Sequence, residues 1–182
     1  ATGFVVTFLI GVASHLLTRK FKRELQPRDG FLLVSMVWAG LPAFSTIPMM
    51  IYFPELSLTD AYFEMVSALT TTGATVLSGL DGMPASINIW RCLLAWMGGM
   101  GILVLAVAIL PLLGVGGSQV FKAETPGPMK DSKLTPRITE TAKSLYLVYF
   151  VLSLACALSY KLAGMTWLDA FMHAGTTMSL SG

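Results

Sequence analysis

The chain has 182 residues, of which 54% are hydrophobic and only 12% are charged, and its formal net charge at pH 7 is +2. Soluble globular domains carry about 25% charged residues, so this composition excludes a water-soluble domain, and its high apolar content excludes a disordered chain. The small net charge also excludes the basic surface of a nucleic-acid-binding protein, which leaves an integral membrane protein.

The first apolar stretch, Gly3–Leu17, is slightly shorter than the roughly 20 residues that a membrane-spanning helix needs. A signal peptide carries its positive charge before the apolar run, whereas here the basic residues follow at 19–23. We therefore interpret residues 1–22 as the end of an N-terminal helix with its cytosolic turn.

Longer apolar stretches predict three membrane-spanning helices at Phe31–Phe53, Ile87–Leu113 and Leu145–Met165. The connectors at 18–30 and 114–143 hold five basic residues each, whereas the connector at 54–86 has acidic residues and no Lys or Arg. Basic connectors stay in the cytoplasm, so the charge pattern predicts that 54–86 faces the outside.

The second basic connector is expected to form a cytosolic linker at 123–143. It contains Pro126, Pro128 and Pro136, and proline interrupts helices because it lacks a backbone N–H. We therefore predict a loop over Glu124–Arg137.

The outer connector is too apolar for a plain loop. Residues 60–70 form an apolar helical run about 15 Å long, half the thickness of a bilayer, with Thr59 or Asp60 as its N-cap. The run ends in the Thr- and Gly-rich segment 71–75, which has poor helix propensity. This pattern predicts a re-entrant hairpin, whose irregular backbone must be buried in protein or line a wet cavity.

The same pattern occurs twice along the chain. Asp60 and Asp169 each begin an Asp-Ala-aromatic motif, and thirteen positions separate them from Gly73 and Gly182, respectively. Each copy follows a span, and the first copy is also followed by one. We therefore predict an all-α membrane protein built from repeated units of span, half-helix, Gly loop and span.

These units have the properties of an ion filter. A half-helix that enters from outside points its C-terminal end, with about half an elementary unit of negative charge, at the middle of the membrane. The Thr/Ser-rich strand that follows can offer backbone carbonyls to a dehydrated ion, and Gly73 and Gly182 permit unusual backbone dihedrals. Rings of carbonyls replace the hydration shell in potassium filters, so the pattern predicts a cation pore.

Charged residues near the outer mouth have two interpretations. Asp60 and Glu64 would attract cations, although Asp60 also suits a helix cap and Glu64 suits a solvated or hydrogen-bonded group. His173 occupies the position equivalent to Glu64, so the repeats do not share a carboxylate at that level. Arg91 lies near the outer end of its span, where it either snorkels to the interface or braces the pore helix by pairing with Asp60, Glu64 or Asp81. The glycines of Gly98-Gly99-Met100-Gly101 favour close helix packing, with a gating hinge as the second interpretation.

A family resemblance is carried by four stretches, Ala68–Thr75, Trp90–Ile102, Ala106–Pro111 and Ala123–Pro128. In sequence and in order they resemble the TrkH family, the membrane subunits of the bacterial Trk potassium uptake system in the Trk/Ktr/HKT superfamily. The resemblance runs from about Arg23 to the last residue.

The resemblance implies potassium uptake through one pore of four repeats in the bacterial inner membrane, a homodimer, a cytosolic nucleotide-binding regulator of the TrkA type, and no cofactor. Carried onto this chain, it implies that the potassium-binding residues are Thr71, Thr72, Gly73 and Ala74 in the first repeat and Leu180, Ser181 and Gly182 in the second. Ser181 stands where family members often have Gly, and we expect a small effect because Gly182 fills the filter-glycine position.

The third and fourth repeats that the resemblance implies are absent from the sequence. We therefore expect a fragment of about one and a half units, divided into the N-terminal helix end (1–22), the first pore repeat (23–122), the linker (123–143) and the second repeat, truncated at its filter (144–182).

An intramembrane enzyme and an alternating-access carrier are the alternatives to a pore. A rhomboid-type intramembrane protease needs a G-x-S-G motif, which neither Ser78 nor Ser181 provides, and Cys92 and Cys156 have no metal-ligand spacing, so we expect no enzyme. An alternating-access carrier coupled to H⁺ or Na⁺ would share the broken helices and stays as the alternative. It does not explain a Gly loop entered from outside in both repeats.

Overall fold

The computed structural model describes residues 2–18, 27–109 and 134–182, and the regular secondary structure within these ranges is all helical. The helices are α1 (Thr2–Thr18), α2 (Pro27–Tyr52), α3 (Leu58–Leu69), the 3-10 helix η1 (Leu80–Gly82), α4 (Ala85–Ile109), α6 (Leu134–Leu162) and α7 (Trp167–Met178). The predicted all-α class is confirmed. Apart from Lys143, the basic side chains of the two cytosolic connectors lie outside the described residues, as do linker residues 123–133.

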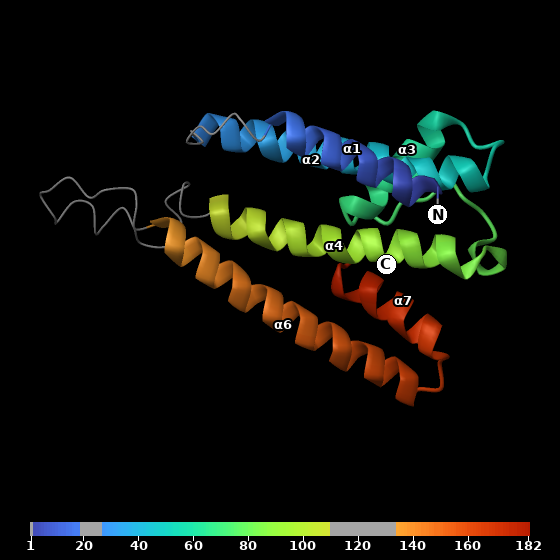
Figure 1. Cartoon of the computed structure of the whole chain (residues 1–182). Helices are drawn as coiled ribbons and strands as arrows, with labels where there is room; N and C mark the ends of the chain where they lie inside the picture. Colours follow the sequence, from blue (N-terminus) through green and yellow to red (C-terminus); the bar gives the residue numbers. More distant parts are fainter. Residues whose placement is uncertain (1, 19–26, 110–133) are drawn as a thin grey trace, which may run out of the picture.

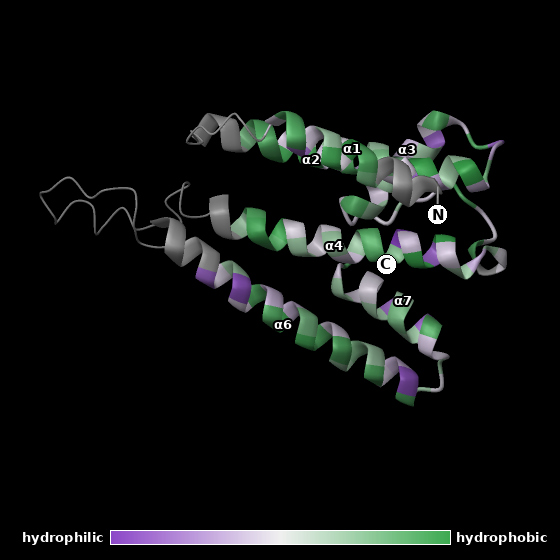
Figure 2. Ribbon diagram, in the orientation of Figure 1, coloured by the Kyte–Doolittle hydropathy of each residue, from purple (hydrophilic) through white to green (hydrophobic). Residues whose placement is uncertain are grey.

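Three of these helices are long and apolar enough to cross a bilayer, over Phe31–Tyr52, Ala85–Ala106 and Glu140–Leu162. Their apolar side chains mostly face outward, because only 17%, 17% and 11% of their most apolar windows is buried inside the molecule (Figure 2). Long apolar surfaces of this kind are stable against lipid and unstable in water. The surface therefore agrees with the membrane protein that the composition predicts.

The central helix of the described part is α4, and the two short helices lie on either side of it (Figure 1). α3 packs between α2 and α4, and α7 packs between α4 and α6. Both short helices have 12 residues, which makes each about 18 Å long, roughly half the thickness of a bilayer. Each short helix ends beside the middle of α4. The segments that follow α3 and α7 therefore begin inside the bundle.

The packing of α3 against α2 depends on a small apolar core. Met49 of α2 and Met65 of α3 are both completely buried, and the core continues through Leu69 and Leu94. The Tyr62 hydroxyl adds a hydrogen bond to a carbonyl of α2, that of Ala39 (3.1 Å). This core fixes the first short helix at the depth where its filter segment begins.

The two short helices begin with the same reciprocal cap. Ser57 accepts a hydrogen bond from the Asp60 backbone N–H (3.1 Å) and donates its hydroxyl to the Asp60 carboxylate (2.7 Å). Thr166 and Asp169 repeat both bonds at 3.2 and 2.6 Å. The prediction of Thr59 or Asp60 as N-cap was therefore wrong, because the hydroxyl of Ser57 reaches the third helical N–H while Asp60 serves as its partner within the first turn.

The start of α6 differs from the prediction. The helix begins at Leu134 rather than at Leu145, so the loop predicted over Glu124–Arg137 is wrong from Leu134 onward. Pro136 lies in the first turn, where the missing backbone N–H would have no partner within the helix in any case. A proline near a helix start is therefore a poor argument for a loop.

Removal of the two caps gives a first prediction. Ser57→Ala and Thr166→Ala should each destabilise the protein by about 1 kcal/mol, the usual cost of losing an N-cap side chain. The two losses should add, because the caps share no partner. Thermal unfolding midpoints in detergent measure the effect, and Ser86→Ala, at an exposed position at the start of α4, is the control. Unchanged midpoints in both single variants would contradict the capping role.

Candidate functional site

Each short helix runs directly into one of the predicted filter segments. Thr71 and Leu180 occupy equivalent positions and have positive φ angles of 57° and 59°, and Gly73 and Gly182 have φ angles of 75° and 84°. A positive φ costs a non-glycine residue about 1–3 kcal/mol, and such strain is concentrated at functional sites. The same strained position in both repeats therefore marks these segments as the candidate site.

The segments are also closed by the same hydrogen bonds. The Thr72 N–H donates to the Ser67 carbonyl (2.9 Å), and the Ser181 N–H donates to the Thr176 carbonyl (3.0 Å). Each bond turns the chain back onto the last turn of its own half-helix. The backbone of the second repeat therefore copies that of the first up to Gly182.

Ser181 behaves like Thr72 in this copy. The Thr72 hydroxyl pairs with that of Thr70 (2.8 Å), and the Ser181 hydroxyl pairs with that of Ser179 (3.1 Å). The Ser181 hydroxyl is thus held against its own helix end.

The two filter segments lie against each other. A Cβ atom placed on Gly73 would lie 1.9 Å from the Ser181 carbonyl oxygen and 2.9 Å from its carbonyl carbon. Only glycine therefore allows the first segment to approach the second so closely. A Cβ atom on Gly182 meets nothing within 4 Å among the described residues, so the close approach depends on Gly73.

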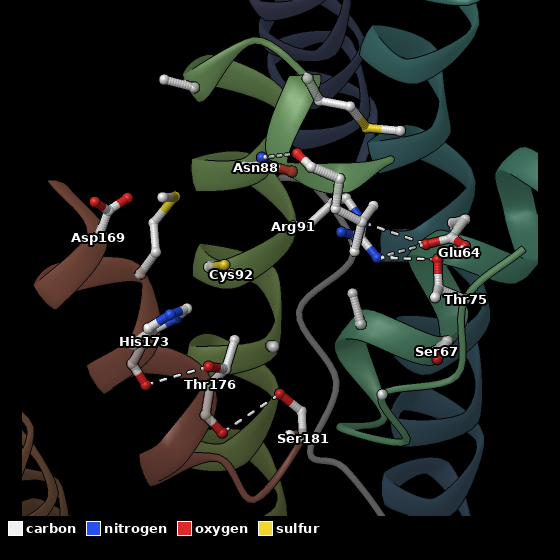
Figure 3. A pocket seen from close by; sticks show the side chains of 18 of the residues that line it. Glu64, Ser67, Thr75, Asn88, Arg91, Cys92, Asp169, His173, Thr176 and Ser181 are labelled. Atoms are coloured by element: carbon white, nitrogen blue, oxygen red, sulfur yellow. Dashed lines mark hydrogen bonds and ion pairs between the residues drawn. The ribbon is translucent and has the colours of Figure 1, made fainter. Parts of the chain in front are cut away.

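Both segments face one cavity of about 790 Å³ (Figure 3). Of the seven predicted filter residues, four line it: Gly73, Ala74, Ser181 and Gly182. Side chains of α3, α4 and α7 complete the wall. Within the described ranges, no group of three or more His, Cys, Asp or Glu side chains is arranged to hold a metal ion.

Ala74 differs from the other predicted filter residues, because its carbonyl oxygen accepts a hydrogen bond of 2.6 Å from the Ser67 hydroxyl. The oxygen is therefore directed toward α3. Sequence reasoning did not single out Ser67; the signal was its match to Thr176, a second hydroxyl at the same place in the repeat.

Glu64 forms the most extensive polar network of the site, with only 1% of its side chain exposed. Its Oε1 accepts hydrogen bonds from the Val76 N–H (2.6 Å), the Leu77 N–H (3.3 Å) and the Thr75 hydroxyl. Its Oε2 accepts two from Arg91, from Nε at 3.2 Å and from Nη2 at 2.9 Å (Figure 3). One carboxylate thus joins the chain after the filter to both α3 and α4.

This geometry decides between the expected partners of Arg91. The partner is Glu64, and Asp60 is engaged by its cap, while the side chain of Asp81 is outside the described residues. Of the two interpretations of Glu64, the hydrogen-bonded carboxylate is confirmed and the cation-attracting charge is not, because the charge is buried and neutralised by the guanidinium. A buried charge is tolerated only when it is paired and hydrogen-bonded.

The second repeat has no such network among the described residues. His173, which is equivalent to Glu64, is exposed and packs edge-on against Tyr160 with ring centroids 6.0 Å apart. It faces the cavity together with Asp169, across from Arg91 (Figure 3). The two repeats therefore share their backbone but not their charges.

The Glu64–Arg91 pair gives a second prediction. Arg91→Ala should destabilise the protein by about 3–5 kcal/mol, because it leaves a buried carboxylate without its countercharge. The double variant Glu64→Gln, Arg91→Leu should lose less than the single variant, since no charge is left unpaired. Thermal unfolding in detergent measures both, with Lys143→Ala at an exposed site as the control. A double variant destabilised at least as much as Arg91→Ala would contradict the coupling.

Comparison with known proteins places this site in a family. A family model described as "TrkH: Cation transport protein" matches residues 1–182. Among curated relatives, the Trk system potassium uptake protein TrkH of Vibrio parahaemolyticus is 51% identical over 182 residues, and that of Escherichia coli strain K12 is 51% identical over 180 residues. The two matches include 100% and 98% of this chain, respectively, but only 38% and 37% of the length of the two relatives.

A solved structure supports the same family. The crystal structure of the potassium transporter TrkH from Vibrio parahaemolyticus matches with a TM-score of 0.78 and 47% sequence identity, over 96% of this chain and 34% of that one. The agreement of the family model along the whole sequence with this structural match leaves one conclusion: the chain belongs to the TrkH family of cation transport proteins.

Proposed function

We propose that the chain forms two neighbouring walls of a potassium-conducting pore, with a filter built from the backbone at 71–73 and 180–182. One observation carries this proposal: two segments of equivalent backbone form, each at the end of a half-length helix, touch at Gly73 and Ser181. The contact requires glycine on one side, as expected where several strands converge on a narrow axis.

The chemistry of the proposed filter is that of carbonyl oxygens. Carbonyl groups can replace the water molecules of a dehydrated potassium ion, and the C-terminal ends of α3 and α7 each add about half an elementary unit of negative charge. No carboxylate is needed in the filter. This agrees with the burial of Glu64, whose charge is already neutralised by Arg91.

Within the first repeat, we assign the ion-facing carbonyls to Thr71, Thr72 and Gly73. Ala74 acts in this proposal through its position, because its bond to Ser67 anchors the outer end of the segment to α3. In the second repeat, the corresponding carbonyls are those of Leu180, Ser181 and Gly182. Potassium is the transported ion, and no cofactor takes part.

For the whole protein, we propose potassium uptake across the bacterial inner membrane. Support comes from the relatives, which are named Trk system potassium uptake proteins. Two walls do not close a ring, so this proposal includes third and fourth repeats that supply the rest of the filter. A homodimer and a cytosolic nucleotide-binding regulator of the TrkA type belong to the same proposal.

Substitution of the filter glycine is the main test. Gly73→Ala should lower the preference for K⁺ over Na⁺ about tenfold, because the new methyl group displaces the Ser181 carbonyl from the filter. Uptake of K⁺ against competing Na⁺, in cells that lack other potassium uptake systems and express the complete gene product, gives the ratio.

The control for this test is Gly82→Ala, since a Cβ atom at Gly82 meets nothing within 4 Å. An unchanged ratio for Gly73→Ala, with normal amounts of protein in the membrane, would contradict the proposed filter.

A further measurement separates a pore from an alternating-access carrier. In planar bilayers, a pore should give unitary currents that reverse near the potassium equilibrium potential, because ions pass without a conformational cycle for each one. Flux that saturates and never resolves into unitary currents would favour the carrier.

A further inference from the structure

Two consecutive glycines in the middle of α4 make the closest contacts of that helix. A Cβ atom on Gly98 would lie 1.8 Å from the Leu69 carbonyl oxygen and 2.8 Å from its carbonyl carbon. A Cβ atom on Gly99 would lie 3.2 Å from both the Cα and the Cβ of Ser179, and 2.6 Å from the Tyr149 hydroxyl. A side chain at either position therefore requires a neighbour to move.

The backbones that these glycines touch belong to the two half-helices. Leu69 is the last residue of α3, and Ser179 is the C-cap of α7. Ser179 directly precedes the second proposed filter segment, and only Thr70 separates Leu69 from the first. Consecutive residues of an α-helix point about 100° apart, so α4 meets one half-helix with each glycine.

The spacing of the two glycines also determines how deep the ends of α3 and α7 lie in the membrane. Adjacent residues rise by about 1.5 Å along a helix, so the ends of α3 and α7 are held at nearly the same level of the membrane. The two filter segments can touch at Gly73 and Ser181 only if their helices end at a common level. Thus the contacts on α4 and the contact between the segments belong to one arrangement.

We propose that Gly98 and Gly99 are the positioning residues of the filter, which set the depth and the separation of its first two walls. This inference rests on the proposed function, because it names what fixes the geometry of that filter. Neither glycine touches the ion. Each acts through the backbone at Leu69 or Ser179, and this close docking takes the place of the gating hinge as the reason for glycine here.

Substitutions at Gly98 and Gly99 should differ in how much they reduce ion selectivity. A methyl group at Gly98 meets backbone atoms that cannot rotate away, so α3 and α4 must separate by roughly 1.5 Å to regain ordinary contact. A methyl group at Gly99 first meets the Tyr149 hydroxyl, which ends a side chain that can move, and the backbone of Ser179 has to yield only slightly. Carbonyl filters discriminate between ions by their coordination geometry, so the larger displacement should cost more selectivity.

The experiment compares Gly98→Ala and Gly99→Ala with Gly101→Ala in the complete gene product. Gly101 is the matched control, because a Cβ atom there would lie 3.5 Å from a Trp38 ring carbon, an ordinary contact. The measured quantity is the ratio of K⁺ to Na⁺ uptake per amount of folded protein, which size-exclusion chromatography quantifies. We expect a fall of about tenfold for Gly98→Ala, about threefold for Gly99→Ala, and no change for the control.

A second variant keeps the test decisive if Gly98→Ala does not fold. Adding Tyr149→Phe to Gly99→Ala removes the nearest clashing atom, so the loss of ratio that remains in the double variant is the part that acts through Ser179. Tyr149→Phe alone is measured beside it, because the hydroxyl also donates to the Trp96 carbonyl (3.2 Å). A loss that persists in the double variant supports the inference, whereas full recovery, or a Gly99→Ala ratio equal to that of the unsubstituted protein, overturns it.

The outcomes separate this inference from the proposed function. An unsubstituted protein with no preference for K⁺ would overturn the proposed filter itself. A selective protein in which Gly98→Ala and Gly99→Ala keep the full ratio would overturn only the positioning role. Loss of uptake with an unchanged ratio would also overturn it, since that result indicates packing without control of selectivity.

Discussion

A helix that stops halfway through a bilayer leaves peptide groups unpaired at a depth that water does not reach, and this constraint shapes the whole arrangement. α3 and α7 both meet it by turning the chain back, so that Thr72 and Ser181 donate to carbonyls of the preceding turn. The ends of α3 and α7 are then covered by α4, where Gly98 and Gly99 leave room for the backbones of Leu69 and Ser179. The segments that follow the two helix ends, which we propose form the filter, meet at Gly73 and Ser181.

The first repeat carries a second fixed point beyond its filter glycine. Glu64 holds the chain beyond Gly73 by accepting hydrogen bonds from two backbone N–H groups, and Arg91 supplies the countercharge from α4. The first segment is thus anchored on both sides of its glycine. In the second repeat the equivalent position is occupied by His173, whose side chain is exposed among the described residues.

Much of this fold could be predicted from the sequence, because apolar length and turn chemistry are local properties. The spans, the half-helices and the repeat of Gly73 at Gly182 all follow from them. The cap at Ser57 was missed since several hydroxyl and carboxylate residues compete within three positions. Which acid pairs with Arg91, and what Gly98 touches, depend on how helices cross in space, and residue spacing does not encode that.

The correspondence between the two repeats lies in main-chain torsion angles, while the residues themselves have diverged: Thr71 corresponds to Leu180 and Glu64 to His173. Recognition by carbonyl groups is indifferent to such replacements as long as the chain keeps its path. Repeats of this kind can therefore differ widely in sequence, and the placement of their glycines will reveal the correspondence between them more readily than sequence identity.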